Sequence, residues 1–436
     1  MTPTPNENTL FAKMANMNDN KENYTQHYMV TFQEALDFIA NNTDLLASEK
    51  QDYEQCYGRV LASDIKAPYS IPSFNNSAMD GYAIRSVDLV NASASLPIKL
   101  KIEGVSAAGD LVEDIDSNHS QLKNTAYKIM TGAAVPDGYD SIIPVENTEV
   151  EGEIVACFSC PKKGAHIRTI GQDFTQGSLI AKQSEVINEN HIMAFAALGI
   201  AKVGVVKKPN IALFSTGKEL VDDASIELKL GQIRNSNKPY LLTYLKNKPV
   251  NVFNAGTNLD QVEEFEKSLT QELESNTEII ISTGAVSMGD FDFIPSTIKK
   301  LGGEIIFHKT KIRPGKPILF AKFPNGTLYF GLPGNPISAN IGLRFFVMHC
   351  LRKMLNLNSE KPLKAKLNHT HTKKHSFVGI QKANAYIDES GSHRIDILDG
   401  QESFKIQPLL NANGWAALSE DDHAWNKDGL VDFYPS

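Results

Sequence analysis

Small-residue segments that follow apolar, β-branched runs constrain the fold of this chain most. The stretch from Gly284 to Asn335 contains GAVSMGDFDFIP, KIRPGKPILFA and GLPGNPISAN, which follow TEIII, EIIFH and TLYFG. A short apolar run bounded by turn residues is typical of a buried strand, so each segment should lie where a strand ends. In open α/β sheets, ligands bind at the carboxyl ends of the strands. The pattern therefore predicts a ligand site formed by several loops at one sheet edge.

Apolar strands alternate with amphipathic helices over residues 207–356. The predicted strands are NIALFST, VNVFNAG, TEIIIST, EIIFHKT and TLYFG, and the helices between them include KPYLLTYLKN and LDQVEEFEKSLTQELES. This alternation indicates right-handed βαβ crossovers and a parallel sheet, hence a doubly wound α/β domain. A helix over 337–355 should pack back onto that sheet.

The rest of the chain predicts further domains, because 436 residues exceed what one core usually supports. Residues 29–85 and 171–206 should form an elongated α+β domain, with a capped helix from Thr31 and a second helix over 48–58. Residues 86–170 alternate like short strands and should form an inserted β domain. Residues 357–436 predict a C-terminal β-barrel domain, and residues 1–28 a disordered tail.

Composition excludes several classes of protein. A formal net charge of −8 disfavours nucleic acid as the main partner, and the chain contains no apolar stretch long enough to span a membrane. Cys157 and Cys160 lack the second pair that a structural zinc site needs, so reduced thiols in a cytoplasmic protein are expected. His369, His371 and His375 lie in HTHTKKH, where a solvated linker is the favoured interpretation over a metal site.

Carboxylates concentrate near the predicted strand ends. Their convergence on a phosphate would be repulsive unless a divalent cation intervened, and Mg²⁺ bound by one or two carboxylates and phosphate oxygens resolves the conflict. Two Ser-Thr-Gly loops, at Thr216 and at Thr283, together with the GLPGNP loop at a helix start, would supply backbone donors for phosphates. The acids concerned are Glu219, Glu278, Asp290 and Asp292, with Asp80 and Asp173 available from other domains.

Two further segments favour a site over an ordinary surface loop. Arg313 and Lys316 lie on the proline-stiffened turn RPGKP, which suits a second, oxygen-rich anion, although solvated bases on a surface hairpin are the alternative. The segment PSFNNSAMDGYAIR could be a simple polar turn, but Met79 and Tyr82 among its polar residues are more typical of a binding site. We recognise no Ser-His-Asp or Cys-His arrangement, so covalent catalysis is disfavoured.

Seven segments, in chain order, resemble the molybdopterin molybdenumtransferases of the MoeA type, a family also represented by the E domain of gephyrin. They are SFNNSAMDGYAIR, IMTGAAVPDGYDSIIPVENT, IRTIGQDF, STGKEL, STGAVSMGDFDF, RPGKP and GLPGNPISAN. The resemblance covers about residues 30 to 430. It implies a four-domain elongated homodimer whose third domain is similar to MogA, the adenylyltransferase partner.

The resemblance also implies an activity: insertion of molybdate into adenylyl-molybdopterin, with Mg²⁺-dependent cleavage of the phosphoanhydride and release of AMP. Transient contact with the adenylyltransferase is implied as well. The catalytic residues would be Asp80, Asp173, Glu219 and Asp292, of which Glu219 and Asp292 would also hold the metal. Molybdate would bind Arg313, Lys316 and Ser338. The other substrate-binding residues would be Thr216, Gly217, Glu278, Thr283, Gly284, Ser287, Pro333, Gly334, Asn335 and Pro336.

The chain departs from the family's pattern at a few positions. Asn75 and Glu278 stand where aspartate is common, Ala285 where glycine is usual and Phe293 where tyrosine is frequent. Two other functions therefore stay open as alternatives to the molybdenumtransferase. One is a pterin-binding scaffold with weakened catalysis, like a receptor anchor, and the other is a pyrophosphatase acting on an unrelated nucleotide.

Overall fold

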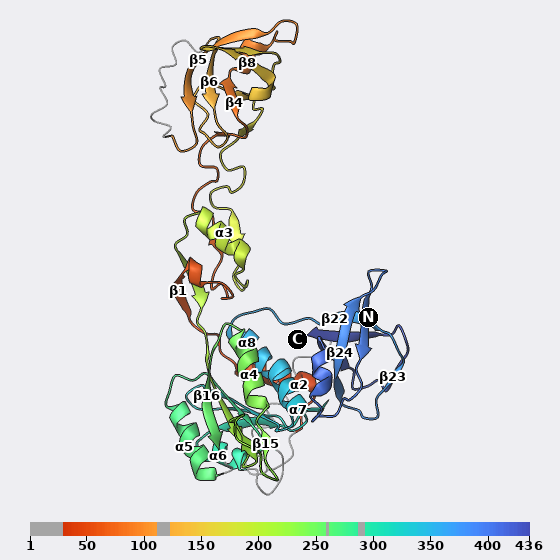
Figure 1. The fold of residues 1–436 in the computed structure, drawn as a ribbon. Helices are drawn as coiled ribbons and strands as arrows, with labels where there is room; N and C mark the ends of the chain where they lie inside the picture. The colour runs from red at the N-terminus through yellow and green to blue at the C-terminus, as the bar shows by residue number, and fades with distance from the viewer. Residues whose placement is uncertain (1–28, 111–122, 259–260, 287–292) are drawn as a thin grey trace, which may run out of the picture. The chain divides into compact units, whose positions relative to one another are not determined.

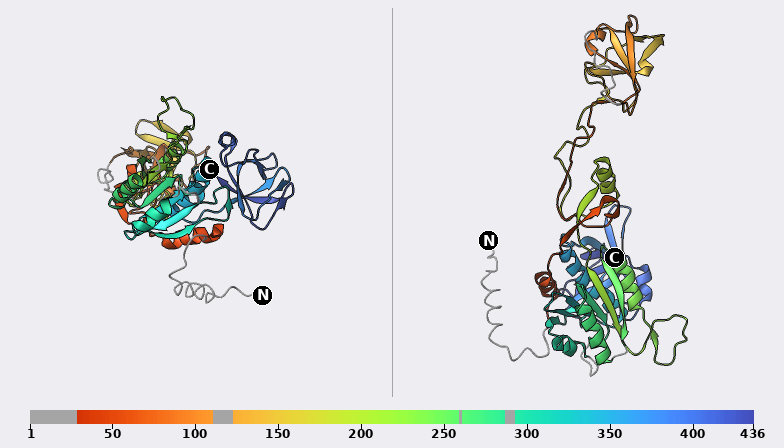
Figure 2. Two further views of the ribbon diagram at one scale, coloured as in Figure 1. Left: turned by 90° about the horizontal axis from the view of Figure 1, so that it is seen from below. Right: turned by 90° about the vertical axis from the view of Figure 1, so that its left-hand side faces the viewer.

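The computed structural model describes residues 29–110, 123–258, 261–286 and 293–436, so the predicted disordered tail over 1–28 lies outside it. These residues form two compact units. The first contains the described part of Met1–Glu49 together with Gly58–Val60 and Val206–Ser436, and the second contains Lys50–Tyr57 and Leu61–Val205. Figures 1 and 2 show the elements of each unit.

A six-stranded sheet forms the centre of the first unit. Its order is β16 (Asn251–Asn258), β13 (Asn210–Thr216), β17 (Ile279–Thr283), β21 (Leu328–Leu332), β20 (Leu319–Lys322) and β18 (Glu304–His308). The first four strands are parallel, whereas β20 is antiparallel to both β21 and β18. The predicted wholly parallel sheet is therefore wrong at β20. This strand precedes β21 through the short turn at Asn325 and Gly326, and a connection that short joins only antiparallel strands.

Helices cover both faces of this sheet, which confirms the doubly wound α/β domain (Figure 1). Alternate strand residues face opposite sides: Ile211 and Leu213 join one core, and Ala212 and Phe214 join the other. The first core also contains residues of α4 (Asn237–Lys246), α7 (Pro336–Ile341) and α8 (Met348–Met354). The second contains residues of α5 (Val262–Leu273) and α6 (Ile294–Lys300). The predicted 337–355 helix is thus α7, a π-helical segment Gly342–Val347, and α8.

The first described helix, α2 (Phe32–Asn42), has the predicted capping box between Thr31 and Glu34. It packs into the core of the α/β domain through Ala35 and Ile39, so its assignment to the elongated domain is wrong. An amphipathic helix packs wherever the larger apolar surface is available, and that surface belongs here to a strand-rich core far along the chain.

The second unit contains a β domain, as predicted. Its sheet has the order β7 (Ser141–Pro144), β4 (Gly81–Ile84), β6 (Thr125–Ile129), β5 (Ile98–Ser106), β9 (Ile154–Cys157) and β8 (Thr148–Glu151). β4 lies inside this sheet, so the predicted boundary at residue 85 is several residues too late. The unit's other elements include β2 (Ile65–Lys66), β3 (Asn76–Ser77), β10 (Ile167–Arg168), β11 (Leu179–Ala181), α3 (Glu189–Ala197) and β12 (Lys202–Val206).

The helix predicted over 48–58 is not formed. The segment instead contains strand β1 (Ser48–Asp52) and a short 3-10 turn (Tyr53–Gln55). Exposure in β1 alternates from residue to residue, which is the period of a strand and not of a helix.

The C-terminal domain is a β-barrel, as predicted. β24 (Val378–Ile387), β25 (His393–Ile397), β22 (Leu363–Leu367), β28 (Leu430–Pro435) and β26 (Gly414–Leu418) pair in that order, and β26 pairs again with β24 to close the ring. A short strand of the α/β domain, β19 (Ile312–Arg313), is parallel to the start of β24. Two short strands, β23 (His371–Thr372) and β27 (Ala424–Trp425), form a separate pair.

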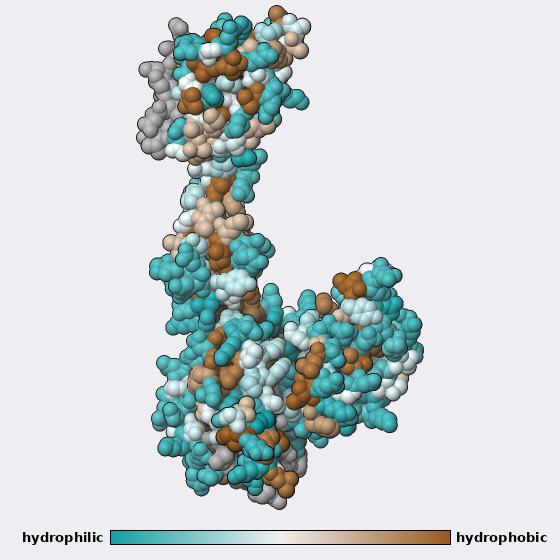
Figure 3. Space-filling view, in the orientation of Figure 1, coloured by the Kyte–Doolittle hydropathy of each residue, from teal (hydrophilic) through white to brown (hydrophobic). Residues whose placement is uncertain are grey.

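Hydrophilic residues cover most of the visible surface of the first unit (Figure 3). Within the described ranges, we find no helix with the length and apolar character needed to cross a membrane.

Candidate functional site

The small-residue loops of the α/β domain meet at one edge of its sheet. Thr216, Thr283 and Leu332 end the parallel strands β13, β17 and β21, and these strands are neighbours. The Thr216 hydroxyl donates a hydrogen bond to the Thr283 carbonyl at 3.1 Å. The Gly284 amide donates to the Leu332 carbonyl at 3.0 Å. The strand ends are therefore held together by bonds between the loops themselves.

Two glycines of this edge are favoured by the backbone geometry. Gly284 has a φ of +93°, and a β-carbon there would lie 2.4 Å from the Thr216 carbonyl oxygen. At Gly217, which has a φ of +147°, a β-carbon would lie 2.7 Å from both carboxylate oxygens of Glu219. The half-buried Glu219 side chain thus folds over Gly217. The positive φ favours glycine at both positions, and at Gly284 a β-carbon would also collide with the Thr216 backbone, whereas the Glu219 carboxylate near Gly217 could move aside.

The predicted anion-binding turn lies at the same edge. β18 and β21 run in the same direction because each is antiparallel to β20, so RPGKP follows a carboxyl end of this sheet. Arg313 and Lys316 are exposed. Gly315 packs against α7, where a β-carbon would lie 3.5 Å from Ile341 Cγ2. The buried Ser338 lies about one turn earlier in that helix, so the three residues predicted for molybdate come from adjoining segments.

The C-terminal barrel borders this turn. The Lys316 ammonium lies 5.8 Å from the centroid of the Phe377 ring, and the Val378 amide donates to the Lys311 carbonyl at 3.0 Å. His375 lies close enough for charges at the turn to affect it: burial, and then the positive charges of Lys373 and Arg313, lower its pKa. A solvated linker was predicted for this histidine, but the pairing of β19 with β24 places it beside the turn.

The GLPGNP loop is held by a residue that the sequence interpretation missed. The Asn237 side-chain amide donates to the Gly334 carbonyl at 2.8 Å, while Gly334 and Asn335 themselves are exposed and Pro333 is buried. Asn237 is the first residue of α4, and the NSN sequence before that helix was the available signal.

The helix start at α7 offers fewer donors than the sequence predicted. Pro336 has no amide hydrogen, and the Ile337 amide donates to the Ser403 carbonyl of the C-terminal domain at 3.0 Å. The expectation that the first turn of this helix presents its backbone donors to a phosphate is therefore wrong for these two residues.

Glu278 does not lie at this edge, so its predicted role in substrate binding stays a prediction that this position does not support. It precedes the first residue of β17, and its carboxylate accepts a hydrogen bond from the Asn210 amide at 2.7 Å, at the start of β13. The five residues of β17 separate it from Thr283 by roughly 16 Å. The carboxylate therefore ties the amino ends of two strands together. Ser287, Asp290 and Asp292 lie outside the described residues.

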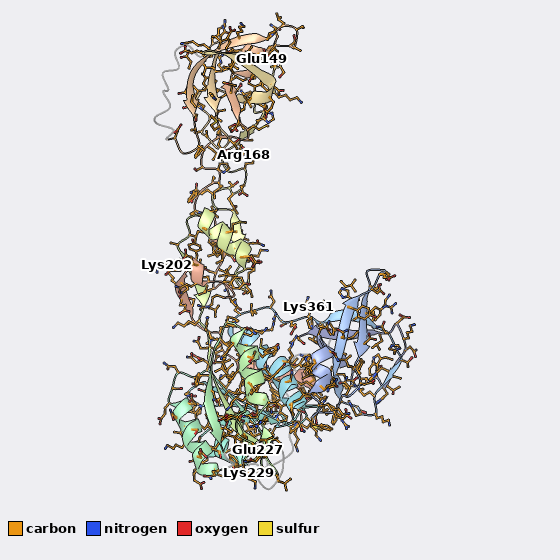
Figure 4. The ribbon with its side chains drawn as sticks, viewed as in Figure 1. Glu149, Arg168, Lys202, Glu227, Lys229 and Lys361 are labelled. Atoms are coloured by element: carbon orange, nitrogen blue, oxygen red, sulfur yellow. The ribbon has the colours of Figure 1, made fainter. Side chains whose placement is uncertain are left out.

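The second unit brings three of the motif segments together. β3 pairs with β10, with Ser77 opposite Ile167 and Asn76 opposite Arg168. The Ser77 amide donates to the Ala133 carbonyl at 3.0 Å, so the TGAAVPDG segment joins the same cluster. Figure 4 shows Arg168 at the end of the inserted β domain where these loops gather.

Two of the predicted catalytic acids lie on this loop cluster, and both are exposed. Asp80 accepts hydrogen bonds from the Thr131 amide at 2.7 Å and the Thr131 hydroxyl at 3.0 Å. These bonds lower the pKa of Asp80. The Asp173 amide donates to the Ile71 carbonyl at 2.9 Å. Thr131 was missed because a threonine in a loop of small residues carries no distinctive signal. Convergence of these acids with Glu219 remains a prediction.

The cysteines and histidines considered for a metal site are separated. Cys157 is buried, which raises the pKa of its thiol to about 11, whereas Cys160 is exposed. His371 pairs with Trp425 in the strand pair β23 and β27. In the part of the chain that the structure describes, His, Cys, Asp and Glu nowhere form a group of three that could hold a metal ion.

The fold and these loops define a molybdopterin-related protein. Residues 30–199 match the MoeA N-terminal region (domain I and II), and residues 212–353 match the probable molybdopterin binding domain. The crystal structure of the molybdopterin biosynthesis MoeA protein from Pyrococcus horikosii is similar, with a TM-score of 0.79 and 26% identity. That comparison covers 94% of this chain and 99% of the other.

Curated relatives agree. A protein named molybdopterin molybdenumtransferase from Synechococcus elongatus is 33% identical over 374 residues, covering 86% of this chain and 91% of the relative. One of the same name from Staphylococcus epidermidis is 33% identical over 387 residues, covering 87% and 89%. The chain therefore belongs to the molybdopterin molybdenumtransferase family, a family of molybdenum cofactor biosynthesis. This confirms the family predicted from the seven motifs.

Proposed function

We propose that this protein transfers molybdenum from molybdate to adenylyl-molybdopterin, with cleavage of the phosphoanhydride and release of AMP. One observation carries the proposal. The loops ending β13, β17 and β21 are bonded to one another at a single sheet edge, and RPGKP leaves the same edge at β18. An edge of this kind offers sites for two anionic ligands side by side.

The glycine loops would hold the pterin phosphates. A β-carbon at Gly334 would lie 3.7 Å from the Gly284 α-carbon, so the two loops approach each other closely while Gly334 itself is exposed. Bare backbone at a strand end allows a phosphate or a flat ring to approach the chain. Thr216, Gly217, Thr283, Gly284, Pro333, Gly334, Asn335 and Pro336 are the described residues that we assign to this ligand.

The donors at this edge fit Mg²⁺. Glu219 lies over Gly217 at a strand end, and magnesium is commonly bound by one or two carboxylates together with substrate phosphate oxygens. We assign Glu219 and Asp292 as its protein ligands. Bound there, the cation would supply positive charge against the phosphoanhydride oxygens.

Arg313, Lys316 and Ser338 would bind molybdate. A guanidinium, an ammonium and a hydroxyl together match the charge and the acceptor oxygens of a tetrahedral dianion. Because RPGKP lies against α7, this anion would be held next to the loop that binds the pterin. Proximity and fixed cationic charge then bring together two reactants that repel each other in water.

Asp80 and Asp173 would complete the catalytic acids. We also propose a cytoplasmic homodimer that receives its substrate by transient contact with the adenylyltransferase. These parts of the proposal rest on the family resemblance and on the exposure of both acids.

The test is the reaction itself. Purified protein is incubated with adenylyl-molybdopterin, Mg²⁺ and molybdate, and AMP is measured. We expect AMP release that depends on molybdate, and its loss in the Arg313→Gln, Lys316→Gln double variant. Lys299→Gln, an exposed lysine at the end of α6, is the matched control. Tight pterin binding without AMP release would support the scaffold function instead, and molybdate-independent hydrolysis of other nucleotides would support the pyrophosphatase.

Single acids separate catalysis from binding. Asp292→Asn and Glu219→Gln should abolish AMP release while molybdopterin binding remains measurable. Glu278→Gln should retain AMP release, because that carboxylate lies at the opposite edge of the sheet. Unchanged turnover in Asp292→Asn would remove this residue from the mechanism.

A further inference from the structure

Asp222 connects three segments at the carboxyl edge of the α/β sheet. Its carboxylate accepts hydrogen bonds from the Thr257 hydroxyl at 2.7 Å and from the Asn235 side-chain amide at 3.0 Å, and it forms an ion pair with Lys238. Thr257 lies near the end of β16, opposite Ser215 of β13. Asn235 follows β15 (Ile233–Arg234), and Lys238 is the second residue of α4. One carboxylate thus holds a strand end, a loop and a helix start.

Only the lysine side of the ion pair is largely buried. The Lys238 side chain is 13% exposed and that of Asp222 is 39% exposed. Burial alone would raise the pKa of Asp222, but hydrogen bonds from Lys238, Thr257 and Asn235 outweigh it, so the pKa is lowered. The Lys238 ammonium also donates a hydrogen bond to the Thr257 hydroxyl at 3.3 Å. The Lys238 backbone amide donates to the side-chain oxygen of Asn235 at 3.2 Å. Each member of the cluster is therefore held by at least one other.

The cluster adjoins two parts of the candidate site, Glu219 and the Gly334 loop. Glu219 precedes Asp222 by three residues, and between them β14 (Leu220–Val221) pairs with β15. The Ile233 amide donates to the Glu219 carbonyl at 2.8 Å. On the other side, Asn237 stands directly before Lys238 and donates to the Gly334 carbonyl. The connection between β14 and β15 projects away from the body of the domain (Figure 2, right), and Figure 4 labels Glu227 and Lys229 on it.

We propose that Asp222 is the positioning residue that fixes Glu219 and the Gly334 loop relative to each other for molybdopterin binding. This role rests on the proposed function, since it assumes that both loops touch the pterin substrate. Its physical basis is that groups which fix the residues touching a ligand commonly matter nearly as much as those residues themselves. The positive charge of Lys238 is paired with the Asp222 carboxylate, so the role of Lys238 is to hold the two loops and not to bind phosphate.

The test compares molybdopterin binding and turnover in matched variants. Asp222→Ala should weaken molybdopterin binding by about 10- to 100-fold and raise KM similarly. Loss of a group that orients ligand-contacting residues has an effect of about that size in metal sites. The kcat should fall less than KM rises, since the residue does not touch the reacting atoms. Asp222→Glu, which keeps the charge, should restore most of the affinity. Asp223→Ala is the control, because the Asp223 carboxylate accepts its hydrogen bonds from Ser225, in its own turn.

A second variant tests whether the ion pair between Asp222 and Lys238 carries this role. Lys238→Met removes the ion pair from the other side, so its affinity loss should resemble that of Asp222→Ala, and the double variant should be little worse than either single one. Wild-type affinity and KM in both single variants would overturn the positioning role alone. Failure of the wild-type protein to bind molybdopterin would overturn the proposed function, and this role with it.

Discussion

The two acid-bearing loop clusters of this protein are built differently. In the α/β domain, the loops follow adjacent parallel strands whose residues Ile211, Leu213 and Ile281 are fully buried, so a rigid sheet sets the position of each loop. In the second unit, the cluster is held by short loop pairings such as Ser77 with Ile167, and its acids Asp80 and Asp173 are exposed. The first cluster thus rests on a parallel sheet together with bonds between its loops, whereas the second rests on short strand pairings and on hydrogen bonds such as those from Thr131 to Asp80.

This difference separates the contributions that the two clusters make to stability and to activity. A core-supported edge tolerates close backbone approach, because displacement of a loop requires repacking of the sheet. Loops held by hydrogen bonds can carry exposed acids without a cost of burial, and such positions affect chemistry more than stability. Substitutions in the two clusters should therefore separate stability from activity.

Gly284→Ala should have the largest effect, and it tests the core-supported edge. The residue combines a φ of +93° with a β-carbon position 2.4 Å from the Thr216 carbonyl oxygen. The positive φ alone costs about 1–2 kcal/mol, and the collision adds to it. We expect loss of molybdopterin binding and a lower Tm, measured by ligand titration and calorimetry. Gly177→Ala, at a φ of +82° but with open space around it, should cost only the backbone strain. Equal effects at both glycines would contradict the steric argument.

Asp80→Asn should abolish most AMP release without changing stability, and it tests the second cluster. The side chain is exposed, and an asparagine oxygen can still accept from Thr131, so unfolding free energy should change by less than about 0.5 kcal/mol. Turnover should fall by at least about 100-fold if this acid acts in proton transfer. Asp137→Asn, another exposed aspartate of the inserted domain, is the control. A clear fall in Tm that accompanies the fall in rate would assign Asp80 a structural role.

His375→Gln should reduce the pH dependence of molybdate binding, an effect of several-fold. Burial and the charges of Lys373 and Arg313 lower the pKa of His375, so the ring is neutral near neutral pH. A bound dianion opposes those charges, and Lys316 against Phe377 adds a further cation at the same turn. Binding therefore favours proton uptake, and wild-type affinity should rise as the pH falls from about 7.5 towards about 6.

Calorimetric titration in buffers of different ionisation enthalpy would measure that proton uptake. His393→Gln, on the exposed part of β25, is the control. If the affinity of the wild-type protein for molybdate did not depend on pH, His375 would not sense the bound anion.

Ala285→Gly should have the smallest effect and a favourable sign. Ala285 has a φ of +48°, a conformation that glycine adopts without strain. We expect the free energy of unfolding to rise by about 1 kcal/mol, seen as an increase in Tm. Destabilisation instead would mean that the alanine methyl group contributes packing that outweighs the strain.

Local pattern predicted much of this fold. Strands of the α/β domain, the capped helix at Thr31 and the short strands of the C-terminal barrel follow from the period of apolar residues and from turn chemistry. The same reasoning failed at residues 48–58, where a strand forms, and at β20, where a hairpin interrupts the parallel order. Both failures involve short segments, in which pairing with distant residues outweighs local preference.

The candidate site divides in a similar way. The sequence by itself determined the family, the glycine loops and most of the charged residues, because glycine at a strand end and bases on a proline turn are local requirements of backbone and charge. Only the tertiary structure placed Glu278 at the amino edge, gave the Ile337 amide to Ser403, and joined Asp222 to Lys238 and Thr257. Such contacts join residues far apart in the sequence, and they form only once packing of the core has fixed strand order and register.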